Sequence, residues 1–161
     1  MCKVLILWLR LFIVTVAFAP LLFCIKAEAH NRSQSFSSWV IDGDVIKVVY
    51  TVKAREITRL PPLEGKTKSL NNLLISHLKN SISVDSGGQS CQGLRNPILL
   101  PAATGFVRAT WTFNCTSDGS RTLQIDSFFP IASSHVHYAQ VAYGEEMPEQ
   151  YLFTDNQRSH V

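Results

Sequence analysis

Two histidines separated by a single residue are the side chains in this sequence best suited to metal binding. His135 and His137 form an H-x-H pair. On a strand, residues i and i+2 point to the same face, so the two imidazoles could converge on one ion. His30 follows a predicted signal-peptidase site, and cleavage there would add a free amine to its imidazole. These nitrogen donors suit Cu(II) or Ni(II), so His30, His135 and His137 are the ligands we expect if a metal is bound.

The same histidines also allow an interpretation without a ligand. An H-x-H pair can lie on an ordinary strand face, and His30 would then be an N-terminal residue with no role. The signatures of common enzymes are missing from the sequence: there is no G-x-S-x-G, no H-E-x-x-H, no P-loop and no dinucleotide fingerprint. We therefore expect a binding or structural protein and not an enzyme.

The first 29 residues have the pattern of a signal peptide. Lys3 and Arg10 precede an apolar stretch over 11–25, and Ala27-Glu28-Ala29 matches the small-x-small site that signal peptidase accepts. The sequence thus predicts a signal peptide over 1–29 and a periplasmic or extracellular domain over 30–161. The alternative is an uncleaved signal anchor that would hold the domain at the membrane.

Two cysteines of the predicted domain form a candidate disulfide. The chain has four cysteines, of which Cys2 and Cys24 fall in the signal segment. Cys91 and Cys115 remain as an even pair in a chain routed to an oxidising compartment, which favours a bond between them over a zinc or redox site. The sequence has no C-x-x-C motif that would indicate thioredoxin-like chemistry.

The charge balance gives no reason to expect a nucleic-acid partner. The formal net charge is +3; the signal segment has three basic residues (Lys3, Arg10 and Lys26) and one acidic residue, Glu28, which leaves 12 basic and 11 acidic residues, a net charge of +1, for the predicted domain. The chain also has no run of lysine and arginine. A domain this close to neutral lacks the basic patch that nucleic acids require.

The elements that would position these residues are mostly strands. Short β-branched or alternating runs cover 33–40, 45–52, 81–84, 98–100, 106–113, 122–128, 136–143 and 151–153. Leucines at helical spacing after Ser69 predict one helix. Seven or eight short strands with one helix, after an N-terminal signal helix, indicate a mainly β protein: an antiparallel β-sandwich.

Five aromatic residues are expected in the core of this sandwich: Trp39, Phe106, Trp111, Phe128 and Phe129. Burial is the usual fate of aromatic side chains at alternating positions. An aromatic-lined binding groove is the alternative interpretation.

Several short motifs, in order, carry a resemblance to a known family. They are Ala29-His30, Ser33-x-Ser35-x-Ser37-x-Trp39, Val48–Val52 followed by Arg55-Glu56, Leu73-Leu74-x-x-His77-Leu78, Trp111-x-Phe113-x-Cys115, Ser134-His135-Val136-His137 and Phe153-Thr154-Asp155-x-x-Arg158. With the Cys91 and Cys115 pair, they resemble the extracytoplasmic N-terminal domain of the HupE/UreJ family. Members of that family are membrane proteins linked to hydrogenase and urease maturation and are regarded as nickel permeases.

The resemblance implies an accessory role in metal uptake. The domain would capture Ni or Cu, or it would dock on a membrane permease or another component of a metal-uptake system. In that family, transmembrane helices follow this domain, whereas here no run of about 18 apolar residues occurs after residue 29. No transport residue can therefore be carried over, and we expect a shortened member, a piece of a longer membrane protein or an independent relative. A structural or protein-interaction β-sandwich without a metal ligand is the alternative function.

Overall fold

Alternating burial along two long neighbouring strands organises the domain. β1 (Gln34–Asp42) and β2 (Val45–Lys53) bury every second side chain and leave the others exposed or partly exposed. They form an antiparallel hairpin. Gly43 lies in its turn with φ +54°, a left-handed conformation that glycine adopts without steric cost. The alternation means that one face of this hairpin belongs to the core and the other faces outwards.

The computed structural model describes residues 32–62, 69–116 and 119–161. The predicted signal peptide and His30 lie outside these residues. The remaining elements are α2 (Ala54–Ile57), α3 (Leu70–Ser81), β3 (Ile82–Ser86), β4 (Gln89–Ser90), β5 (Gln92–Gly93), β6 (Ile98–Leu100), β7 (Phe106–Asn114), β8 (Arg121–Ile125), β9 (Val136–Tyr143), β10 (Glu149–Phe153) and β11 (Ser159–His160). Within the described residues, no helix is long and apolar enough to cross a membrane.

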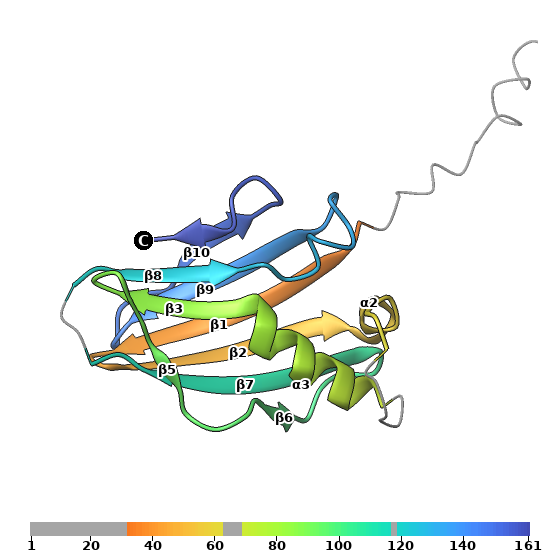
Figure 1. The fold of residues 1–161 in the computed structure, drawn as a ribbon, viewed down its shortest axis with the longest axis horizontal. Coiled ribbons are helices and arrows are strands. Elements are labelled where there is room, and N and C mark those ends of the chain that lie inside the picture. The colour runs from red at the N-terminus through yellow and green to blue at the C-terminus, as the bar shows by residue number, and fades with distance from the viewer. Residues whose placement is uncertain (1–31, 63–68, 117–118) are drawn as a thin grey trace, which may run out of the picture. The chain divides into compact units, whose positions relative to one another are not determined.

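The strands form two sheets. The large sheet has seven strands in the order β10-β9-β1-β2-β7-β5, with β6 also paired to β7. The small sheet has four, in the order β11-β8-β3-β4. Figure 1 shows α3 together with β3 and β8 on one side of the large sheet. The opposite side of the large sheet, which we call the outer face, is not covered by any described element.

The core lies between the large sheet and the layer formed by α3 and the small sheet. Its members from the large sheet include Trp39, Val48 and Tyr50, and they belong to one cluster with Leu74 of α3 and Leu123 of β8. The leucine spacing that predicts α3 therefore reflects real burial against the sheet. Trp39, Phe128 and Phe129 are fully buried, as expected, whereas Phe106 and Trp111 are only partly buried.

The mainly β fold with two packed sheets confirms the predicted class. Two details differ from the expectation. A second helix, the four-residue α2, follows β2 directly. β1 also pairs in parallel with β9, so the large sheet is mixed and not purely antiparallel. Parallel pairing joins strands about a hundred residues apart, which alternation within either strand does not reveal.

Candidate functional site

The two histidines of the H-x-H pair share one face, and that face is the core side of the large sheet. His135 immediately precedes β9 and His137 is its second residue. Their exposed fractions are 1% and 0%. His137 stacks on Tyr50 with ring centroids 5.3 Å apart, and His135 packs between Phe128 and Phe129. The alternation prediction is therefore confirmed for the pair, although its imidazoles are enclosed.

Three serines contact these imidazoles. Ser35 and Ser37 belong to β1, and Ser33 lies just before it. The parallel register sets Ser35 opposite His137. Ser35 Oγ lies 2.8 Å from His135 Nε2 and 2.7 Å from His137 Nδ1. Ser33 Oγ lies 2.7 Å from His135 Nδ1, and Ser37 Oγ lies 2.7 Å from His137 Nε2. All four ring nitrogens thus contact a serine hydroxyl, and we call this arrangement the serine–histidine ladder.

The Glu56 end of the ladder fixes the direction of the hydrogen bonds there, and the Trp39 end is compatible with the same direction. At one end the Trp39 indole N–H, which can only donate, bonds to Ser37 Oγ at 2.7 Å. At the other end the Ser33 hydroxyl donates to Glu56 Oε2 at 2.6 Å. Because that hydroxyl has one proton, Ser33 must accept from His135 Nδ1–H. His135 Nε2 is then an acceptor for a serine hydroxyl.

The same reasoning extends through the second imidazole. If Ser35 donates to His135 Nε2, it must accept from His137 Nδ1–H, which leaves His137 Nε2 to accept from Ser37. A single direction of donation then runs from Trp39 to Glu56, with both imidazoles neutral and protonated on Nδ1. We assign these tautomers from the hydrogen-bond network.

Ser127 and Tyr50 complete the ladder from the side. Ser127 Oγ lies 2.9 Å from Ser35 Oγ, 2.7 Å from the Tyr50 hydroxyl and 3.1 Å from His135 Nε2. Ser127 has φ +40°, which is uncommon for a residue other than glycine. The surrounding hydrogen bonds hold it in this conformation, because a strained backbone persists only where several neighbouring contacts fix it.

Burial keeps the ladder uncharged apart from its acidic end. It lowers the pKa of His137 to about 3, with a further contribution from His135, and it lowers that of His135 to about 4. Burial also raises the pKa of Tyr50 to about 12. The carboxyl of Glu56 has a lowered pKa: burial raises it, but the hydrogen bond from Ser33 and the guanidinium groups of Arg59 and Arg55 outweigh that effect.

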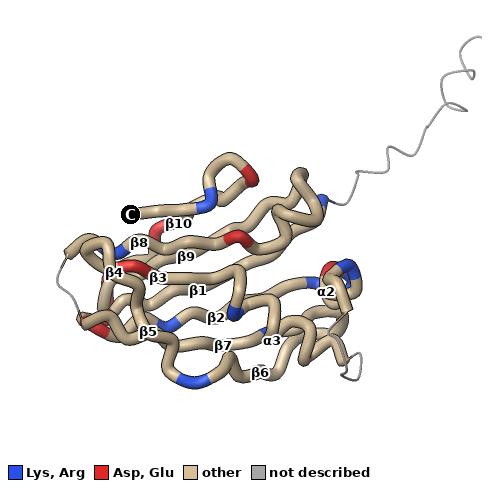
Figure 2. The backbone as a smooth tube through the Cα atoms, viewed as in Figure 1, with Lys and Arg blue, Asp and Glu red and all other residues tan. Residues whose placement is uncertain are grey.

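Glu56 connects the ladder to the surface through two arginines. Arg59 Nη1 lies 3.0 Å from Glu56 Oε2, and Arg55 Nε lies 3.3 Å from Oε1. Figure 2 shows acidic and basic residues meeting at α2. Burying a carboxylate is costly unless it is paired and hydrogen-bonded, and here both conditions are met.

The structure brings His135 and His137 together, but they form no metal site within the described part of the chain. His135 and His137 converge on Ser35 Oγ instead of an open position, and residues 32–62, 69–116 and 119–161 contain no group of three His, Cys, Asp or Glu side chains able to hold an ion. His30 lies outside these residues, so its part in a Cu(II) or Ni(II) site stays a prediction.

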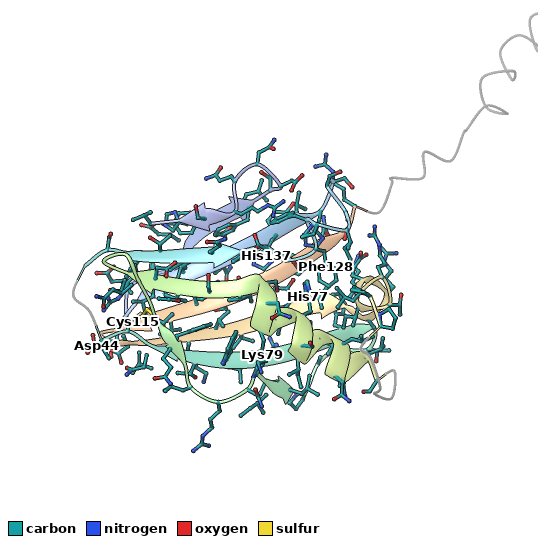
Figure 3. The ribbon with its side chains drawn as sticks, in the orientation of Figure 1. Asp44, His77, Lys79, Cys115, Phe128 and His137 are labelled. Carbon is teal, nitrogen blue, oxygen red and sulfur yellow. A yellow bond between two sulfur atoms is a disulfide. The ribbon has the colours of Figure 1, made fainter. Side chains whose placement is uncertain are left out.

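Two further histidines pack on aromatic rings. His77 of α3 lies beside Phe128, with ring centroids 4.7 Å apart (Figure 3). Burial lowers its pKa to about 4, and its Nε2 has no hydrogen-bond partner among the described residues. His160 lies against the ring of Tyr151.

The predicted disulfide is present. Cys91 and Cys115 are bonded, with their Cα atoms 4.5 Å apart. Cys91 lies between β4 and β5, and Cys115 follows β7. The bond therefore links the end of a large-sheet strand to the segment that leaves the small sheet.

A second candidate site, which the sequence did not indicate, lies on the outer face. A cavity of about 400 Å³ crosses β10, β9, β1, β2 and β7 there. Its lining includes the exposed rings of Phe36 and Tyr138, which stack at 5.6 Å with an interplanar angle of 16°. We call it the outer groove. The aromatic groove considered from the sequence involved other residues. The sequence signal that could have indicated the outer groove is the alternation of Phe36 with the serines of β1, which places Phe36 on the face opposite to them.

No protein-family model matches the chain, and no curated protein matches it at a significant level. The resemblance to the HupE/UreJ domain therefore stays a prediction from the residue pattern.

Proposed function

We propose that this chain is an exported, non-catalytic recognition domain that binds its partner at the cell envelope through the outer face of the large sheet. One observation carries the proposal. The residues suited to chemistry are enclosed in the core, whereas the exposed aromatic pair lies on the uncovered face: Phe36 is 38% exposed and Tyr138 43% exposed. Exposed aromatic clusters rimmed by polar groups are typical of binding sites.

The enclosure of the ladder argues against a catalytic role. Ser127 and His135 have the residue types of a nucleophile and its base, but they are 0% and 1% exposed. A substrate would need to contact at least one of them. Their hydrogen bonds instead tie β1, β9 and the segment before β9 into one unit, so the ladder supports the sheet that displays the outer groove.

The signal-peptide pattern and the Cys91–Cys115 bond support export, because such bonds persist in oxidising compartments. The HupE/UreJ resemblance would make a membrane permease the partner, and a docking role is compatible with the geometry. A metal-capturing role would need ligands beyond the two enclosed imidazoles.

Site-specific photocrosslinking in intact cells tests the proposal. A photoreactive amino acid replaces Gln140 in the outer groove or, as the control, Asn72, which is exposed on α3. We expect an adduct from position 140 that disappears when Phe36 and Tyr138 are both changed to serine, and none from position 72. Equal labelling at the two positions, or no adduct from either, would overturn the proposal. Stoichiometric Ni(II) or Cu(II) binding without any adduct would also overturn it, in favour of metal capture.

A further inference from the structure

The outer groove has an ordered chemistry across the strands. The register sets Tyr138, Phe36, Thr51 and Arg108 in one line over β9, β1, β2 and β7. Neighbouring strands lie about 4.8 Å apart, so this line is roughly 14 Å long. Aromatic rings form one end, the hydroxyl of Thr51 lies in the middle and a guanidinium forms the other end. A second line beside it contains Gln150, Gln140 and Ser38.

The lining favours a ligand with both a flat apolar face and many hydroxyl groups. Stacked rings offer a surface for the C–H face of a ring, and an amide side chain supplies a donor and an acceptor side by side. Gln140 and Gln150 can therefore each bond to neighbouring hydroxyls. A purely apolar ligand would leave these amides unpaired, which costs binding energy.

Charge adds a second requirement. Among the described residues that line the groove, Arg108 is the only one that is a lysine, an arginine, an aspartate or a glutamate. It is exposed and takes part in none of the salt bridges between described residues. Arginine binds a carboxylate through two parallel hydrogen bonds, so the groove is suited to one anionic group at this end.

We propose that the outer groove binds an acidic saccharide, a short chain of pyranose rings that carries carboxylates. One ring would stack on Tyr138 and Phe36, the amides of Gln140 and Gln150 would bind hydroxyls, and Arg108 would bind a carboxylate. The cavity of about 400 Å³ lies within the range of roughly 300–1,000 Å³ for ligand sites. This inference rests on the proposed recognition function, for which it names the ligand class.

Calorimetric titration tests the inference, with protein purified from the exported fraction of cells that express the full chain. The probes are trimers of galacturonate, mannuronate and glucuronate, and the matched ligand of each is the same trimer with its carboxyls reduced to alcohols. We expect at least one uronate trimer to bind, and its carboxyl-reduced form to bind about 10- to 100-fold more weakly, the loss expected for charge-assisted hydrogen bonds.

Four variants locate the site. Arg108→Ala is expected to weaken binding by the same factor as carboxyl reduction, and Tyr138→Ala to abolish it. Two variants are controls. Lys79→Ala removes an exposed cation from α3 (Figure 3), and Tyr143→Ala removes an exposed tyrosine that is an odd number of residues from Tyr138 in β9, a spacing that belongs to the other face of the strand. Both variants should bind the trimer as the unchanged chain does. Circular dichroism confirms that each variant is folded.

Two results would overturn the inference. One is no binding to any uronate trimer. The other is binding that carboxyl reduction and Arg108→Ala leave unchanged. If photocrosslinking at position 140 then still gave an adduct with a membrane protein, the recognition function would stand while its ligand would be a protein and not a saccharide.

Discussion

Ser35 Oγ lies between two imidazoles, 2.8 Å from Nε2 of His135 and 2.7 Å from Nδ1 of His137. One hydroxyl thus occupies the position where the H-x-H motif would place a metal ion. It can donate to one ring and accept from the other, which satisfies two buried nitrogens at once. Ser35 is therefore the one serine of the ladder that contacts both histidines.

Replacing Ser35 by alanine should destabilise the domain strongly. The change removes the hydroxyl that contacts Nδ1 of His137, and it leaves Nε2 of His135 with only the 3.1 Å contact to Ser127 Oγ. An unsatisfied buried group costs about 1–3 kcal/mol. Urea unfolding followed by circular dichroism measures the effect. Ser38→Ala is the control, because Ser38 is exposed on the same strand and its loss should change the free energy of unfolding by no more than about 0.5 kcal/mol. Equal stability of the two variants would contradict the ladder.

Both ladder histidines should be neutral and protonated on Nδ1 at pH 7. For His135 this follows from the Ser33 hydroxyl, which donates to the Glu56 carboxylate, and for His137 it follows from a Ser35 hydroxyl that donates to His135. Long-range ¹H–¹⁵N correlation spectra of labelled protein distinguish the two tautomers of each ring. His160, which is outside the ladder, serves as the internal reference. An Nε2–H signal from His135 would contradict the assigned direction.

Stability should fall as the pH is lowered from about 6.5. The folded pKa values of His135 and His137 are about 4 and about 3, both below the usual 6.5, so the unfolded chain binds protons first. Each of these histidines then lowers the free energy of unfolding by up to about 1.4 kcal/mol per pH unit, until the pH reaches the pKa of that histidine in the folded protein. The lowered pKa of His77 adds to the loss.

Urea midpoints measured between pH 7.5 and pH 4 give this slope. The stabilising contribution should be fully present above pH 6.5 and should decrease through the whole interval below it. His160→Gln, which changes a histidine outside the ladder, is the control variant. A flat profile down to pH 4.5 would show that the ladder histidines are accessible to protons in the folded state.

Reducing the Cys91–Cys115 bond should lower the free energy of unfolding by about 3 kcal/mol. The sequence separation is 24 residues, and closing a loop of that length restricts the unfolded chain by about this amount in the chain-entropy model. Unfolding curves with and without dithiothreitol, compared with a Cys91→Ser/Cys115→Ser variant, measure the difference. Identical curves would show that the bond contributes nothing to stability.

The sequence by itself determined the features that depend on local periodicity. Alternation placed His135 and His137 on one face of their segment, and it placed Ser33, Ser35 and Ser37 together on one face of theirs. Helical spacing identified α3, and two cysteines in a chain with a signal-peptide pattern identified the disulfide. These features repeat within a few residues, so a single segment contains all the information needed.

Only the tertiary structure decided that these serines and histidines lie side by side on the core face of one sheet. Ser35 and His137 are 102 residues apart, and they come together because β1 and β9 pair in parallel. The same holds for Glu56, which reaches the ladder from α2, and for the outer groove, whose lining comes from five strands. Strand pairing depends on non-local contacts and on how the whole core packs, and no pattern within one strand specifies its neighbour.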